Sequence, residues 1–174
     1  GTKIIGIKSL TKEAGATTLI YMMKKELEKN YSVVAYEIDK RDFTYFKDNN
    51  LISTTSTAIG LEIAKSKAEA ILIDLNSNKI VSDLCETIIY LLEPTIIKLN
   101  RLLAGNPRVL ADLSEKKLVL CKSLLSPKDV SDFENESGIK VFFNMPPVND
   151  RETGNNEINH LLVKLGFSRQ SYDK

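Results

Sequence analysis

The strongest constraint on the fold is the alternation of short β-branched runs with amphipathic stretches along the chain. Runs such as Lys3–Lys8, Ser32–Ile38 and Ala70–Leu75 are short, apolar and rich in Ile and Val, which favours strands. The stretches between them place apolar residues at helical spacing. This order predicts the α/β class, with a mostly parallel central sheet and helices on both of its faces.

The same patterns predict the remaining elements. Further strands are expected at Thr87–Leu92, Lys117–Cys121 and Lys140–Asn144. Helices are expected at Thr17–Lys29, Ala58–Lys67 and Asn155–Phe167. A further helix should follow Glu93-Pro94, with Ile96, Ile97, Leu99, Leu102 and Leu103 on its apolar side. Another should begin after an N-cap at Ser126, with Pro127 at its first position. Lys40–Ser56 is polar and lacks periodicity, which predicts a mobile loop.

Composition narrows the class of protein. A length of 174 residues with 43% hydrophobic content suits one buried core, so we expect a single domain over residues 1–174. Lys and Arg number 24 against 23 acidic residues, a net charge of +1, which disfavours a dedicated nucleic-acid binder. The apolar runs are too short for a transmembrane helix, and no secretory signal is visible, so we expect a cytoplasmic protein.

Cysteine and histidine are scarce. Cys85 and Cys121 both lie in apolar segments without a CxxC pair, and His160 is the single histidine. A structural metal site and thiol catalysis are therefore disfavoured. We expect both cysteines to be free, buried and apolar in character, and His160 to be structural or solvent-facing.

The segment between the first strand and the first helix contains the residues that indicate ligand binding. Gly15-Ala16-Thr17-Thr18 stands at a helix N-terminus, where backbone N–H groups attract phosphate and a glycine lets the main chain approach closely. A Walker A loop has a lysine directly after this glycine, followed by Ser or Thr for magnesium. Here Ala16 occupies the lysine position. Carboxylates at Asp39 and Asp74 end two later strands, which predicts a site at the carboxyl edge of the sheet.

These residues resemble the MinD/ParA group of P-loop ATPases, whose loop typically reads KGGxGK followed by Thr or Ser. The segment here is TKEAGATT, so Thr11 replaces the signature lysine of the group and Lys12 and Glu13 replace two glycines. The GATTL ending is similar to the atypical loops of TadZ/CpaE-type pilus-assembly proteins. Similar pilus proteins carry an attached receiver domain, which makes this chain compatible with one domain of a longer protein.

The resemblance implies a P-loop fold of the MinD/ParA type and a nucleotide site for ATP or ADP with Mg²⁺. Its residues would be Lys12, Gly15, Ala16, Thr17, Thr18, Asp39 and Asp74, with Thr17, Asp39 and Asp74 at the metal and Asp39 orienting the attacking water. Removal of a phosphate-binding lysine lowers affinity about ten- to a hundredfold, so we expect weak or absent nucleotide binding and no efficient ATPase activity.

The favoured function is a localisation or scaffold protein with a poorly hydrolysing or inactive nucleotide site, acting in pilus or secretion-system assembly. It would act through homodimerisation and protein partners, which could recruit it to the inner face of the membrane. One alternative is a slow ATPase that uses Lys12 in place of the missing lysine and works as a dimerisation switch. Another is a partition-type module that binds DNA nonspecifically through a basic strip.

The residues also allow purely structural interpretations. Gly15–Thr18 could be a turn and helix cap, with Asp39 and Asp74 only ending their strands. The basic strip of Lys24, Lys25 and Lys29 is better explained as a solvated helix face, because Glu26 and Glu28 interrupt it. DNA binding is therefore disfavoured.

Overall fold

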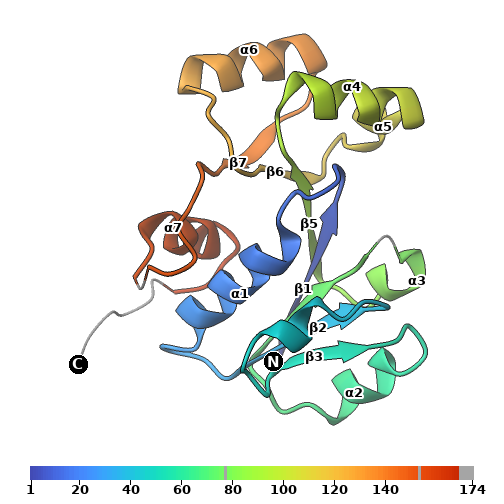
Figure 1. Cartoon of the computed structure of the whole chain (residues 1–174), viewed down its shortest axis with the longest axis vertical. Helices are drawn as coiled ribbons and strands as arrows, with labels where there is room; N and C mark the ends of the chain where they lie inside the picture. Colours follow the sequence, from blue (N-terminus) through green and yellow to red (C-terminus); the bar gives the residue numbers. More distant parts are fainter. Residues whose placement is uncertain (77, 153, 169–174) are drawn as a thin grey trace. The chain divides into compact units, whose positions relative to one another are not determined.

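The computed structural model describes residues 1–76, 78–152 and 154–168 (Figure 1). The chain forms two compact units. Unit 1 comprises residues 1–8, 16–88 and the described residues from Asp150 onward. Unit 2 comprises Ser9–Gly15 and Ile89–Asn149.

Unit 1 is built on parallel strands. These are β1 (Lys3–Ser9), β2 (Val33–Ile38), β3 (Leu51–Thr54) and β4 (Ala70–Asp74), in the spatial order β3-β2-β4-β1. Leu72 of the fully buried β4 pairs with Ile5 on one side and with Ala35 on the other. Continuous burial of this strand explains why its sequence is an unbroken apolar run up to Asp74.

Helices cover both faces of the unit 1 strands. They are α1 (Ala16–Leu27), α2 (Ile59–Lys65), α3 (Lys79–Ser82) and α7 (Asn156–Lys164). Ile59 of α2 and Val81 of α3 join a core cluster with Val34, Tyr36 and Ile38 of β2. The alternate residues of β2 face the other way, where α1 contacts β2 and β4 and α7 packs on α1 (Figure 1).

Unit 2 also has parallel strands. They are β5 (Thr87–Leu92, which begins in unit 1), β6 (Lys117–Leu120) and β7 (Val141–Asn144), in that spatial order. Its helices are α4 (Ile96–Gly105), α5 (Val109–Asp112) and α6 (Pro127–Ser137). The core consists of Leu92, Val109, Leu113, Leu118, Leu120 and Ile139.

The predicted α/β class is confirmed, and every strand predicted from the sequence is present. The bounds Thr87–Leu92 agree with β5. Ser126 caps α6 as predicted: its side chain accepts from the Asp129 N–H, and the Asp129 carboxylate accepts from the Ser126 N–H. Thr95 caps α4, and Asn155 caps α7. Of these three caps, the one at Ser126 was predicted from the sequence.

The prediction of a mobile loop at Lys40–Ser56 was wrong. This segment contains the 3-10 helix η1 (Asp42–Tyr45) and strand β3, which pairs with β2. The buried side chain of Glu37 organises it by accepting from the N–H groups of Asp42 and Phe43, at 3.0 and 2.6 Å, and from the Ser53 hydroxyl at 2.6 Å. The Glu37 carboxylate therefore orders this segment through hydrogen bonds, which the pattern of polar and apolar residues does not indicate.

Two further expectations need correction. Ile96 and Ile97 are 79% and 65% exposed, because the α4 face that packs into the core is that of Leu99, Leu102 and Leu103. Cys85 is free but only partly buried, whereas Cys121 is buried. His160 is exposed.

The basic strip also differs from the expected solvated face, because Lys24 is completely buried. Its ammonium lies 2.7 Å from Asp48 and 3.0 Å from Glu28, and Lys29 pairs with Glu26. In the part of the chain that the structure describes, no helix is both long and apolar enough to cross a bilayer.

Candidate functional site

The loop Ser9–Gly15 in unit 2 begins where β1 ends. The Leu10 N–H donates to the Leu91 carbonyl at 2.8 Å, so the loop starts out bound to β5. Thr11, which replaces the signature lysine, is buried, and its hydroxyl accepts from the Glu93 N–H at 3.0 Å. The side chain at this position therefore fixes the loop and leaves no group to contact phosphate.

Three side chains from distant parts of unit 2 bind successive carbonyls of the loop. Lys98 of α4 donates to the Lys12 carbonyl at 3.0 Å, and Lys122 donates to the Glu13 carbonyl at 2.7 Å. The Cys121 thiol donates to the Ala14 carbonyl at 3.0 Å. Burial, followed by the nearby charge of Glu93, raises the pKa of this thiol to about 11, which keeps its proton in place.

The N–H groups of the loop contrast with its carbonyls. Among the described residues, those of Lys12, Glu13, Ala14 and Gly15 donate to no protein acceptor. In an anion-binding backbone, the N–H groups remain available to donate to the anion. Here side chains hold the carbonyls, and the N–H groups are left available in this way. The backbone of this loop is therefore compatible with an anion such as phosphate.

The backbone also explains the residue types of the loop. Gly15 has φ +93°, and a Cβ atom there would lie 3.3 Å from the Lys122 Cε. Glu13 has φ +56°, a left-handed conformation that favours glycine and costs other residues about 1–2 kcal/mol. Glu13 stands where the resembling family has glycine, and this φ gives the physical reason. Strain of this kind is concentrated at functional sites.

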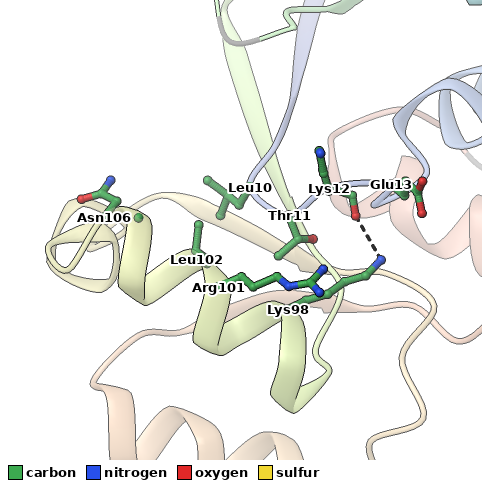
Figure 2. A pocket seen from close by; sticks show the side chains of 9 residues that line it. Leu10, Thr11, Lys12, Glu13, Lys98, Arg101, Leu102 and Asn106 are labelled. Carbon is green, nitrogen blue, oxygen red and sulfur yellow. Dashed lines mark hydrogen bonds between the residues drawn. The ribbon is translucent and has the colours of Figure 1, made fainter.

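Lys12 and Glu13 are both exposed. Figure 2 shows the Lys12 side chain directed away from α4, while its carbonyl receives the hydrogen bond from Lys98. Within the described residues, the Lys12 ammonium forms no ion pair or hydrogen bond. The cations that hold this loop are Lys98 and Lys122, which sequence reasoning missed because they lie 86 and 109 positions from their partners.

The other predicted site residues belong to unit 1, at the carboxyl ends of β2 and β4. Asp74 is buried, and one of its oxygens accepts from the Asn76 N–H at 3.2 Å. The Asn76 amide donates to the Ile38 carbonyl at 3.0 Å and so ties the ends of the two strands together. Asp39 is exposed, with φ +55°.

Lys40 supplies a positive charge in this group. Its ammonium lies 2.5 Å from the second oxygen of Asp74, in an ion pair that is not aligned as a hydrogen bond. It also lies 3.7 Å from Asp42, whose carboxylate accepts from the Thr17 hydroxyl at 3.3 Å. Thr17 therefore does not cap α1 through its side chain. It is linked to Asp74 through Asp42 and Lys40.

This arrangement does not fit a magnesium ion held by Thr17, Asp39 and Asp74. Magnesium requires hard oxygen ligands in near-octahedral geometry. Here an ammonium occupies the open oxygen of Asp74 and a carboxylate engages the Thr17 hydroxyl. Within the described ranges, no three His, Cys, Asp or Glu residues lie close enough together to hold a metal.

The sequence-predicted site residues are thus divided between the units. Lys12 and Gly15 lie in unit 2, and Ala16, Thr17, Thr18, Asp39 and Asp74 lie in unit 1. In unit 1 the structure links Thr17 with Asp74 through intermediate side chains. In unit 2 it orders the loop through residues that the sequence had not indicated.

Solved structures show which fold this is. The chain is similar to a ParA family ATPase of Chlorobium tepidum, with a TM-score of 0.58 and 12% identity, covering 94% of this chain and 90% of that one. It is similar to a putative plasmid partition protein of Borrelia burgdorferi bound to AMPPNP, with a TM-score of 0.55, 16% identity and coverages of 95% and 97%. It is also similar to a chain of the MinC:MinD cell division protein complex of Aquifex aeolicus, with a TM-score of 0.53, 11% identity and coverages of 83% and 81%.

The fold is therefore that of the ParA and MinD P-loop ATPases, as the loop and the two carboxylates had indicated. Identities of 11–16% show the fold alone. No family model matches the sequence, and no curated protein matches it significantly.

Proposed function

We propose that this chain is a ParA/MinD-like localisation or scaffold protein whose nucleotide site is atypical and hydrolyses poorly or not at all. The main support is the chemistry of the loop. Thr11 is occupied in holding the loop, and Ala16 has no charge to offer. Phosphoryl transfer depends on positioning and on neutralisation of the transferred charge, and this loop supplies only the first.

The unit 1 carboxylates support the same proposal. Lys40 already neutralises Asp74, and Asp39 is exposed without a described partner for its carboxylate. A bound anion at the loop would therefore be held chiefly by backbone N–H groups. We infer binding of ATP or ADP that is weak and depends little on Mg²⁺, with the resemblance assigning Lys12, Gly15, Ala16, Thr17, Thr18, Asp39 and Asp74 to the nucleotide.

The biological setting follows from the resemblance of the GATTL segment. We propose a role in pilus or secretion-system assembly, in the cytoplasm, through homodimerisation and protein partners that bring the chain to the membrane. The MinC:MinD complex among the similar structures is consistent with a protein partner for this fold. The chain is also compatible with one domain of a longer protein.

Calorimetry with ATP, with and without Mg²⁺, tests the nucleotide part. We expect equal affinity in the two conditions, no phosphate release above background, and loss of binding in Gly15→Ala. Arg108→Gln, a change at an exposed residue outside the proposed nucleotide site, should leave binding unchanged. Turnover that requires Mg²⁺ and falls in Lys12→Ala and Asp39→Ala would contradict the proposal and favour the slow ATPase switch.

A partition-type module that binds DNA nonspecifically is the other candidate, favoured only by the partition proteins among the similar structures. The pairing of Lys24 with Asp48 and Glu28, and of Lys29 with Glu26, argues against a basic strip on α1. DNA binding that weakens steeply with salt would support this candidate, because phosphate contacts release counterions.

A further inference from the structure

Unit 2 contains a cavity of about 530 Å³ between the loop and helix α4. This volume lies within the roughly 300–1,000 Å³ typical of pockets for small organic ligands. Leu10 of the loop and Leu102 of α4 line one end, and Lys98 and Arg101 line the other (Figure 2). The cavity therefore has an apolar end and a basic end.

The α4 side of the cavity follows from helical spacing. Lys98, Arg101, Leu102 and Gly105 recur at i, i+3, i+4 and i+7, which places them on one face of the helix. Gly105 has no side chain to fill the space, and nothing lies within 4 Å of the position that its Cβ would occupy. The helix thus presents a row of two cations, one leucine and one gap.

The two cations differ in how they are neutralised. Lys98 forms an ion pair with Glu93 and donates to the Lys12 carbonyl, so its charge is already balanced and its position is fixed. Arg101 is exposed and, among the described residues, has no carboxylate partner and no hydrogen bond. A guanidinium of this kind can bind a phosphate or a carboxylate through two parallel hydrogen bonds.

None of the residues assigned to the nucleotide explains this cavity. Lys12 lines it, but its side chain points away from α4 (Figure 2), and the remaining nucleotide residues do not line it. Lys98 connects the cavity to the loop, because the same ammonium lines the cavity and holds the Lys12 carbonyl. A ligand here would therefore contact the group that orders the loop.

We propose that this cavity is a second ligand site, which binds a small organic oxyanion with an apolar body. Arg101 binds the oxyanion, and Leu10 and Leu102 cover the apolar body. The oxyanion chemistry is shared by phosphate esters and carboxylates, which the experiment separates. The site is independent of the proposed nucleotide function, since it requires neither Ala16 nor the carboxylates of unit 1.

The test titrates the whole chain, without Mg²⁺, with three probes in calorimetry and in amide NMR spectra. ADP carries phosphates and an aromatic base, pyrophosphate carries phosphate alone, and 4-phenylbutyrate carries a carboxylate and an apolar body. We expect ADP or 4-phenylbutyrate to bind more tightly than pyrophosphate, with shifts at Lys98, Leu102 and Asn106. Whichever of the two binds identifies the oxyanion.

Arg101→Gln should weaken that binding at least about tenfold, because a charge-assisted hydrogen bond is lost. Arg108→Gln is the matched control, since Arg108 is exposed in the same unit and does not line the cavity. Binding to neither ADP nor 4-phenylbutyrate, or equal affinities in the two variants, would overturn the proposal. ADP binding that is lost in Gly15→Ala but unchanged in Arg101→Gln would overturn it while supporting the proposed nucleotide function.

Discussion

The Lys40 ammonium lies 2.5 Å from a carboxylate oxygen of Asp74, whose side chain is only 3% exposed. In the resembling ATPases this aspartate ends a strand at the nucleotide site, and here an internal cation is its partner. The pair accounts for the charge of a buried carboxylate without a metal. It is also the contact through which the unit 1 part of the proposed site can be tested.

Replacement of Lys40 by Met should destabilise the protein, because it leaves Asp74 buried and unpaired. We expect the free energy of unfolding to fall by roughly 1–3 kcal/mol in urea titrations at pH 7. The double variant Lys40→Met, Asp74→Asn should recover much of this loss, since it removes the unpaired charge. Equal stability of wild type and Lys40→Met would mean that the ion pair contributes nothing in solution.

Replacement of Glu37 by Gln should loosen the segment that contains η1 and β3. A neutral amide cannot accept with both ends from the Asp42 and Phe43 N–H groups and the Ser53 hydroxyl. We expect faster amide hydrogen exchange across residues 42–54 and a loss of roughly 1–3 kcal/mol in unfolding free energy. Asp39→Asn, a change at an exposed carboxylate nearby, is the control and should leave exchange in this segment unchanged.

The contact between Lys24 and Asp48 should make stability depend on pH. Burial alone would raise the pKa of Asp48, but hydrogen bonds from Lys24 and the Asn50 N–H, with the Lys24 charge, hold it below its ordinary value of 3.8. A lowered folded-state pKa gives a contribution that is present above pH 3.8 and is lost as pH falls through the folded value.

Asp48→Asn should therefore be less stable than wild type at pH 7, and the difference should shrink below about pH 4. Urea titrations of both proteins between pH 7 and pH 3 measure this. A constant difference across the range would show that the carboxylate charge is not what stabilises this contact.

Neither cysteine should react as a thiolate in the folded protein. Burial raises the pKa of Cys85 to about 12 and is the main cause that raises the pKa of Cys121 to about 11. Since the thiolate is the reactive form, we expect almost no reaction with a disulfide reagent at pH 8. In guanidinium chloride both thiols should react at once. A rapid phase of one thiol in the native protein would contradict the burial that we describe.

Lys122 should control the order of the loop. Lys122→Met removes the donor to the Glu13 carbonyl but keeps most of the apolar stem. We expect lower backbone order parameters from ¹⁵N relaxation at Glu13, Ala14 and Gly15, with little change in β6. Lys128→Met is the matched control, because Lys128 is 84% exposed on α6. Equal order parameters in the two variants would show that the loop is ordered without this lysine.

Short-range chemistry in the sequence determined most of the fold. Strand β5, the cap at Ser126 and the position of Gly15 all depend on neighbouring residues, so local patterns were sufficient. The Gly15–Thr18 segment and the strand-terminal carboxylates indicated the P-loop fold through their resemblance to the MinD/ParA group. Alternation of strands and helices then determined the α/β class.

Tertiary structure decided the features that depend on distant partners. Strand β3 forms because β2 and the Glu37 carboxylate organise a polar segment, and Lys24 is buried because Asp48 meets it there. The two lysines that bind the loop carbonyls could not be predicted from the sequence either. The resemblance places Thr11 and Ala16 where the family has lysines, whereas the fold brings Lys98 and Lys122 to the loop carbonyls from 86 and 109 positions away. Periodicity describes a single element, and contacts between elements depend on how the elements pack.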